Sequence, residues 1–201
     1  MVIIIYLLAF TGGFVIMSLE LLGGRVLAPY FGSSIYVWGS IITVFMLSLA
    51  LGYLAGGRLS VREPSLSKFG TIFLIGAILM YPLILYADPA MQWIFDRIED
   101  PRFGSLIASA LLFMVPTVIL GMISPYSVRL LVESVERAGQ VAGRLYFVST
   151  LGSSMGTLAT SFYLVLVFEI NTILVALTGT LVAMFVIAII SHRLGLSRSV
   201  K

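Results

Sequence analysis

Six apolar segments of roughly 20 residues divide this chain and constrain its fold more than any other feature. They cover residues 2–22, 35–55, 69–87, 105–124, 145–168 and 172–191. An α-helix of this length crosses the hydrocarbon core of a bilayer, whereas a lone strand would leave its backbone groups without hydrogen-bond partners there. The sequence therefore predicts an all-α membrane protein with six transmembrane helices in a single domain, residues 1–201.

The composition agrees with burial in lipid and excludes several kinds of site. Only 10% of the residues are charged, against about 25% in soluble domains, and 60% are hydrophobic. The chain has no cysteine and one histidine, so we expect no disulfide, thiol chemistry, metal site or cofactor. The first segment has no Lys or Arg before it, which favours a retained span over a cleaved signal peptide.

The basic residues lie mostly on one side of the predicted membrane. Nine of the twelve fall there: Arg58, Arg62, Lys68, Arg129, Arg137, Arg144, Arg193, Arg198 and Lys201. Because cytoplasmic loops carry the excess of Lys and Arg, we expect both termini in the cytoplasm of a multi-pass cell-membrane protein.

Two connections carry apolar residues among charged ones. Residues 88–102 predict an amphipathic helix at the outer interface. Residues 125–140 predict an amphipathic cytoplasmic helix after the fourth span.

Glu20 and Arg25 form the most informative polar pair, at the end of the first segment. A carboxylate within the membrane is costly and usually has a partner or a wet cavity. Gly23 and Gly24 would break the helix and let Arg25 fold back. One interpretation is a proton-, cation- or substrate-linked site, and the other is a salt bridge that holds the turn.

Glycines recur at GxxxG spacing in the second and fifth segments. The pairs are Gly52 with Gly56, and Gly152 with Gly156. This spacing lets another helix approach closely, and the pairs occupy matching positions if the chain consists of two sets of three helices. The pattern favours tight helix packing, with a moving interface as the alternative.

A third set of residues lies in the cytoplasmic turns. Arg58, Arg129, Glu133 and Arg137 are predicted either to form a charge network on the inner face or to act as ordinary positive-inside anchors. The sequence has no nucleotide-binding glycine loop, no nucleophile elbow and no HExxH motif, so we expect no enzyme activity and no nucleic-acid partner.

Several stretches resemble one known family: ELLGGRVLAPYFGSSIYVWGSII, LALGYLAGGRLS, GMISPYSVRLL and GRLYFVSTLGSSMGTLATSF. They are similar to the membrane-embedded, major-facilitator-like domain of the fused spermidine synthase-like proteins. The resemblance runs from Glu20 to Phe162 and implies a six-helix bundle equivalent to half of a major-facilitator transporter. The soluble synthase domain of that family, with its glycine-rich cofactor loop, has no counterpart here, so the resemblance implies no synthase activity.

Two functional hypotheses follow, because half of such a transporter needs a partner. In the first, the chain is a non-catalytic membrane subunit or anchor that contacts lipids and packs against other membrane proteins. A separately encoded synthase-like protein is one such partner that the resemblance suggests. In the second, the chain forms a homodimer that transports small molecules, with polyamines or other cations suggested by the resemblance alone. The lack of acids within the spans, apart from Glu20, favours the first.

Overall fold

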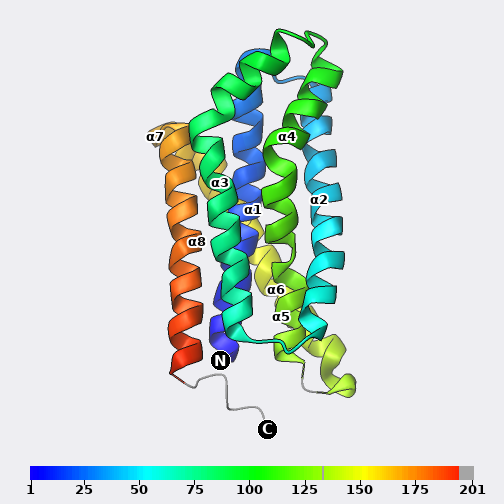
Figure 1. Cartoon of the computed structure of the whole chain (residues 1–201), viewed down its shortest axis with the longest axis vertical. Helices are drawn as coiled ribbons and strands as arrows, with labels where there is room; N and C mark the ends of the chain where they lie inside the picture. Colours follow the sequence, from blue (N-terminus) through cyan, green and yellow to red (C-terminus); the bar gives the residue numbers. More distant parts are fainter. Residues whose placement is uncertain (133, 195–201) are drawn as a thin grey trace.

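The structure is a computed structural model, and it describes residues 1–132 and 134–194 (Figure 1). The helices are α1 (Val2–Phe31), α2 (Ile35–Val61), α3 (Leu66–Phe95), α4 (Pro101–Gly121), α5 (Ile123–Leu131), α6 (Val135–Ala159), the π-helical turn η1 (Thr160–Leu164), α7 (Val165–Val167) and α8 (Ile170–Arg193). In this part of the chain six helical segments are long and apolar enough to cross a membrane. The predicted all-α fold with six spans is confirmed.

The predicted separate helix over residues 88–102 is wrong, because its first half completes α3, which ends at Phe95. The buried stripe of α3 continues through this part, with Ala87, Met91 and Ile94 in the core. Their spacing of four and three residues keeps them on one helical face, so packing extends the helix past the apolar segment.

The predicted helix over residues 125–140 is also wrong, because the chain divides there into the end of α5 and the start of α6. A turn at Met122 separates α4 from α5. Pro125 has no N–H to donate to the carbonyl four residues earlier, which accounts for the turn at this point. Tyr126 is fully buried, and its ring stacks on Phe69 at a centroid distance of 5.5 Å. Core packing therefore makes α5 part of the fourth span.

The helices pair in a pattern that suits two sets of three. The most extensive contacts are α1 with α6, α2 with α4, and α3 with α8, and α1 also touches every other span. The first three spans are α1, α2 and α3, and their counterparts among the last three are α4, α6 and α8. Replacing each helix by its counterpart turns the α1–α6 pair into the α4–α2 pair and leaves the α3–α8 pair as it is. Equivalent spans run in opposite directions, as the course of α1 and α4 shows (Figure 1). This is the contact pattern of an inverted repeat.

Basic residues gather at the end of the bundle where the N-terminus lies. Arg58, Arg129 and Arg193 stand in the last turns of α2, α5 and α8, which finish at that end (Figure 1). Arg97 and Arg102 lie at the opposite end, at the turn between α3 and α4.

Single cysteines at the two ends test the orientation, since the natural chain has none. We expect Arg62→Cys to react only from the cytoplasmic side and Asn171→Cys only from outside; both positions are exposed. Labelling with an impermeant maleimide in intact cells and in inverted vesicles measures this. Reaction of both cysteines from the same side contradicts the six-span topology.

Candidate functional site

Glu20 and Arg25 lie on one unbroken helix, so the predicted break at Gly23 and Gly24 is wrong. Both glycines are buried where a larger residue would crowd aromatic rings: Gly23 faces Phe113 of α4, and Gly24 faces Trp38 of α2. Five residues along a helix turn the side chain by about 140° net, so Glu20 and Arg25 leave α1 on different faces. Glu20 is half-buried and Arg25 is exposed. Arg25 does not fold back toward Glu20.

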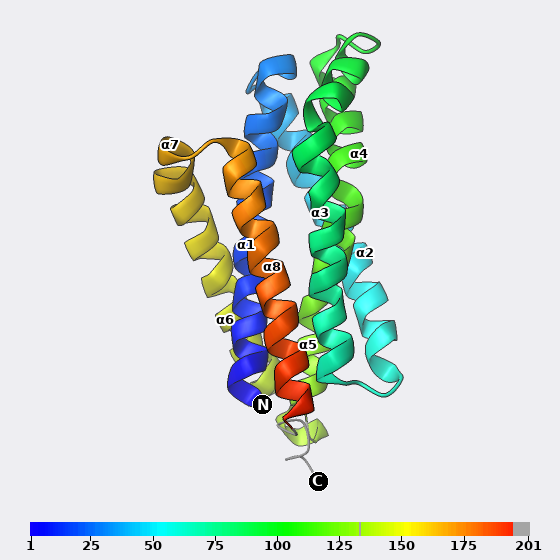
Figure 2. The same cartoon turned by 60° about the vertical axis from the view of Figure 1, so that its left-hand side comes forward.

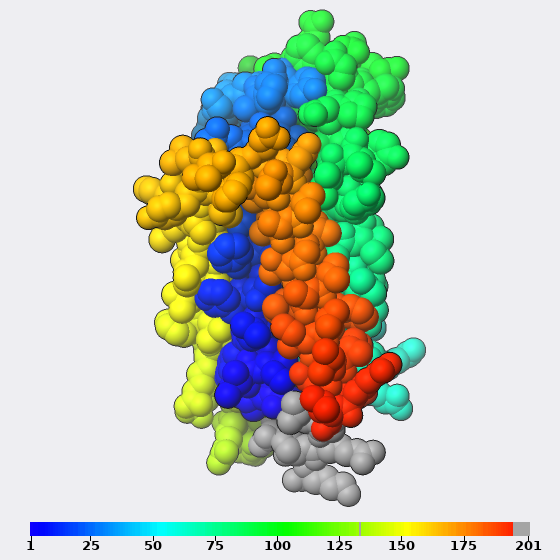
Figure 3. Space-filling model, turned by 90° about the vertical axis from the view of Figure 1, so that its left-hand side faces the viewer, coloured from blue at the N-terminus to red at the C-terminus, as the bar shows by residue number. Residues whose placement is uncertain are grey.

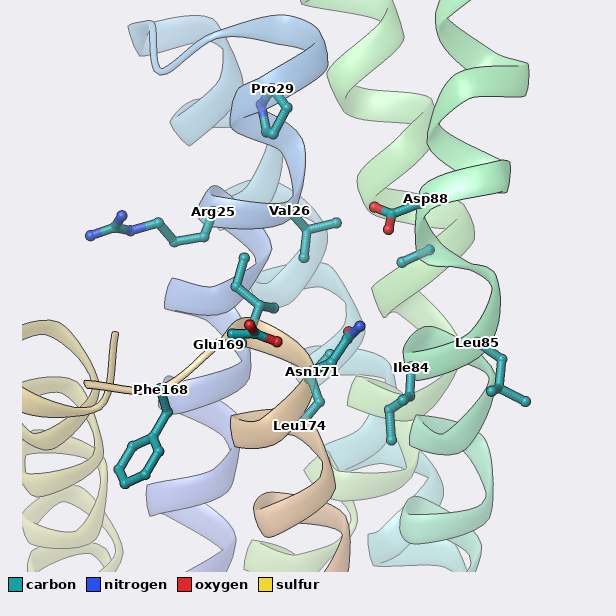
Figure 4. A pocket seen from close by; sticks show the side chains of 12 residues that line it. Arg25, Val26, Pro29, Ile84, Leu85, Asp88, Phe168, Glu169, Asn171 and Leu174 are labelled. Atoms are coloured by element: carbon teal, nitrogen blue, oxygen red, sulfur yellow. The ribbon is translucent and has the colours of Figure 1, made fainter. Parts of the chain in front are cut away.

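Arg25 borders a pocket of about 410 Å³ between α1, α3 and α8. Asp88, Glu169 and Asn171 supply its other polar side chains, while Arg25 extends away from Asp88 (Figure 4). All four residues are exposed. The pocket is therefore open to the surroundings and does not enclose a site.

Gly152 and Gly156 bring α6 into close contact with α1. A Cβ atom at Gly152 would overlap the backbone carbonyl of Phe10, and one at Gly156 would lie 2.9 Å from the Cα atom of Phe14. The two glycines thus let α6 rest on the backbone of α1 over one helical turn. A hydroxyl pair extends this contact, since Thr160 donates to Ser18 at 2.9 Å.

Gly52 and Gly56 do the same between α2 and the junction of α4 and α5. A Cβ atom at Gly52 would overlap the carbonyl oxygen of Val118, and one at Gly56 would lie 2.6 Å from the Cα atom of Met122. This contact is the equivalent of the first one under the exchange of the two sets of three helices. The two GxxxG pairs therefore form matching seams, one in each set.

The arginines of the predicted charge network lie on three helices at the same end of the bundle. Arg58, Arg129 and Arg137 are all exposed. Glu133, the predicted acidic member, lies outside the described residues. The charge network stays a prediction.

The helix α6 belongs to the span that is both the least apolar and the most exposed of the six. The span that contains α6 has the lowest mean hydropathy of the six. Even so, only 17% of the residues in its most apolar 18-residue stretch are buried. The next most exposed span, α8, is 28% buried and has the highest mean hydropathy. Figure 3 shows α6 standing apart from α8, with α1 visible between them. The surface of α8 suits lipid, whereas that of α6 is not uniformly apolar.

Hydroxyl groups occupy one side of this span, at positions 146, 149, 150, 153, 157 and 161. Positions 146, 149, 153, 157 and 161 follow one another at three or four residues, and position 150 lies four residues after 146, so all six fall on one side of the helix. We call this set the hydroxyl stripe. Two pockets place the stripe on the side of α6 that faces α2: Tyr146 lines one with Tyr53, and Ser161 lines the other with Trp38. The opposite side carries exposed apolar residues such as Leu151 and Met155.

The first of these cavities, which we call the hydroxyl pocket, has a volume of about 350 Å³ between α2, α5 and α6. Sequence reasoning missed it because its residues come from three distant segments. The one available signal was the recurrence of Ser and Thr at helical spacing in the fifth span.

Comparison of the chain with models of protein families, with curated proteins and with solved structures finds no match in any of the three. The resemblance to the membrane domain of the spermidine synthase-like proteins stays a prediction. The function has to be argued from the geometry of the bundle.

Proposed function

We propose that the chain is a non-catalytic integral membrane subunit, or anchor, that packs against a partner membrane protein. The partner covers the surface between α2 and α6, which we call the α2–α6 face. Its side on α2 carries Ile42, Met46 and Tyr53, and its side on α6 is the hydroxyl stripe. The gathering of basic residues at the end that holds the N-terminus supports cytoplasmic termini in the cell membrane.

The observation that carries this proposal is the exposure of the least apolar span. A helix in lipid places its polar side toward protein, because hydrocarbon offers no partner to a hydroxyl group. Within the described residues α6 packs on α1 and, less extensively, on α5 (Figure 2). Ser149 and Ser153 of the hydroxyl stripe are half-buried beside Gly13 of α1, whereas Thr150 is exposed. Another membrane protein can supply the missing contacts, since Ser and Thr hydroxyls form hydrogen bonds between helices.

On the α2 side, the α2–α6 face exposes residue types that are common in interfaces between proteins. Met46 is 66% exposed and Tyr53 is 47% exposed. Methionine and tyrosine are enriched in interfaces between proteins. Apolar side chains from α2 and hydroxyl groups from α6 therefore border the same surface, which suits a partner helix better than lipid tails.

A homodimeric small-molecule transporter is a second candidate, favoured by the two pockets on this face. Two copies joined through their α2–α6 faces would enclose both pockets between them. The lining gives no support to polyamines or other cations as the cargo, because Arg25 is the one charged residue among the described residues that line either pocket.

Purification of the tagged full-length chain in mild detergent tests the proposal, with mass spectrometry of the proteins that co-migrate. We expect one other membrane protein in fixed stoichiometry. A homodimer without a second protein supports the transporter candidate instead. A monomer that elutes alone after gentle extraction and chemical cross-linking contradicts both.

A further inference from the structure

The hydroxyl pocket has an unusual lining for a cavity within a membrane bundle. Six of its seven lining residues carry a hydroxyl group: Tyr53, Ser124, Tyr146, Ser149, Thr150 and Ser153. The seventh is Pro125, so no charged side chain among the described residues lines the pocket. Its volume of about 350 Å³ falls at the lower end of the range for small-molecule sites.

The hydroxyls of this pocket are available to a ligand. Helical serines in this bundle often donate to the carbonyl four residues earlier, as Ser127 does to Ile123 at 2.7 Å. Within the described residues, Ser149, Thr150 and Ser153 have no such bond from their hydroxyls, although Thr157 and Ser161 on the same helical run do.

The pocket lies on the exposed α2–α6 face, well away from the ends of the helices. Tyr53 stands eight residues before the end of α2 at Val61, which corresponds to about 12 Å along the helix axis. At that depth lipid tails cannot form hydrogen bonds. A cluster of open hydroxyls there requires water, a ligand or polar groups of a partner.

We propose that the hydroxyl pocket binds a small uncharged molecule with several hydroxyl groups, such as a polyol or a monosaccharide. Hydroxyl side chains both donate and accept hydrogen bonds, as the hydroxyls of such a ligand do. The rings of Tyr53 and Tyr146 add apolar faces beside the polar groups. A charged ligand would find no counter-ion among the described lining residues. The described lining residues all belong to this chain, so the isolated chain should bind the ligand while its α2–α6 face is uncovered.

Calorimetric titration of the purified full-length chain in detergent tests the chemical class. The uncharged probes are myo-inositol and glucose, and the charged controls of similar size are gluconate and glucosamine. We expect at least one uncharged probe to bind at least about tenfold more tightly than both charged compounds. Absence of binding by both uncharged probes, or equal affinity for charged and uncharged compounds, overturns the proposal.

Substitutions then locate the site. The double variant Ser149→Ala with Ser153→Ala removes two hydroxyls and little volume, and we expect it to weaken binding at least about tenfold. Ser154→Ala changes an exposed neighbour that does not line the pocket, and binding should be unchanged. Tyr53→Phe removes one hydroxyl that α2 contributes to the pocket, and its effect on affinity tests the same site from a second helix. Full affinity in the double variant and in Tyr53→Phe contradicts the assignment.

Discussion

Gly152→Ala should lower the free energy of unfolding by about 1–3 kcal/mol, the usual cost of overpacking. The added methyl group would overlap the carbonyl of Phe10, which belongs to the backbone of α1 and cannot rotate away. The helices α1 and α6 must therefore separate. Because this contact and the one at Ser18 and Thr160 hold α6 to the bundle, the loss should loosen the whole helix.

Gly143→Ala is the matched control, because it lies on the same helix with nothing within 4 Å of an added Cβ atom. It should leave stability unchanged or raise it by up to about 1 kcal/mol, through the better helix propensity of alanine. Gly52→Ala should resemble Gly152→Ala, since it overlaps the carbonyl of Val118 in the equivalent seam. Reversible unfolding in bicelles measures all three. Equal stabilities of Gly152→Ala and Gly143→Ala would show that the seam is not tightly packed.

Thr150→Trp should abolish association with the partner, whereas Met155→Trp should leave it intact. Both positions are exposed on α6, but Thr150 belongs to the hydroxyl stripe and Met155 lies on the opposite, apolar side. An indole at Thr150 blocks the approach of another helix to the α2–α6 face. The same group at Met155 meets lipid tails, which rearrange around it.

Recovery of the partner with each tagged variant measures this effect. Loss of a well-packed interface contact costs 2 kcal/mol or more, about thirtyfold in affinity. We expect at least that reduction for Thr150→Trp. An equal yield of partner with both variants would place the interface elsewhere on the bundle.

Apolar run length was sufficient to predict the six spans, because the bilayer sets the length of each helix independently of its neighbours. Gly52 and Gly152 were also recognisable from sequence, since the GxxxG spacing itself creates a flat helix surface. Gly23 and Gly24 were misread as helix breakers. Whether a glycine breaks a helix depends on packing, and here Phe113 and Trp38 cover both residues.

The ends of the helices and the hydroxyl pocket depend on contacts between distant segments. The extension of α3 to Phe95 follows from core positions that are visible only once α3 is packed. The pocket joins Tyr53, Ser124 and Ser149, which lie about a helix or more apart in sequence. Periodicity identifies one side of α6 as polar, but it does not show which helix stands opposite.

The central claim is that the hydroxyl stripe of α6 faces protein and not lipid. Site-specific photo-crosslinking in native membranes tests it most directly, with a benzophenone side chain at Thr150 in one variant and at Met155 in another. We predict that the probe at Thr150 gives a discrete protein adduct and that the probe at Met155 labels lipid. Lipid labelling alone at both positions would contradict the account.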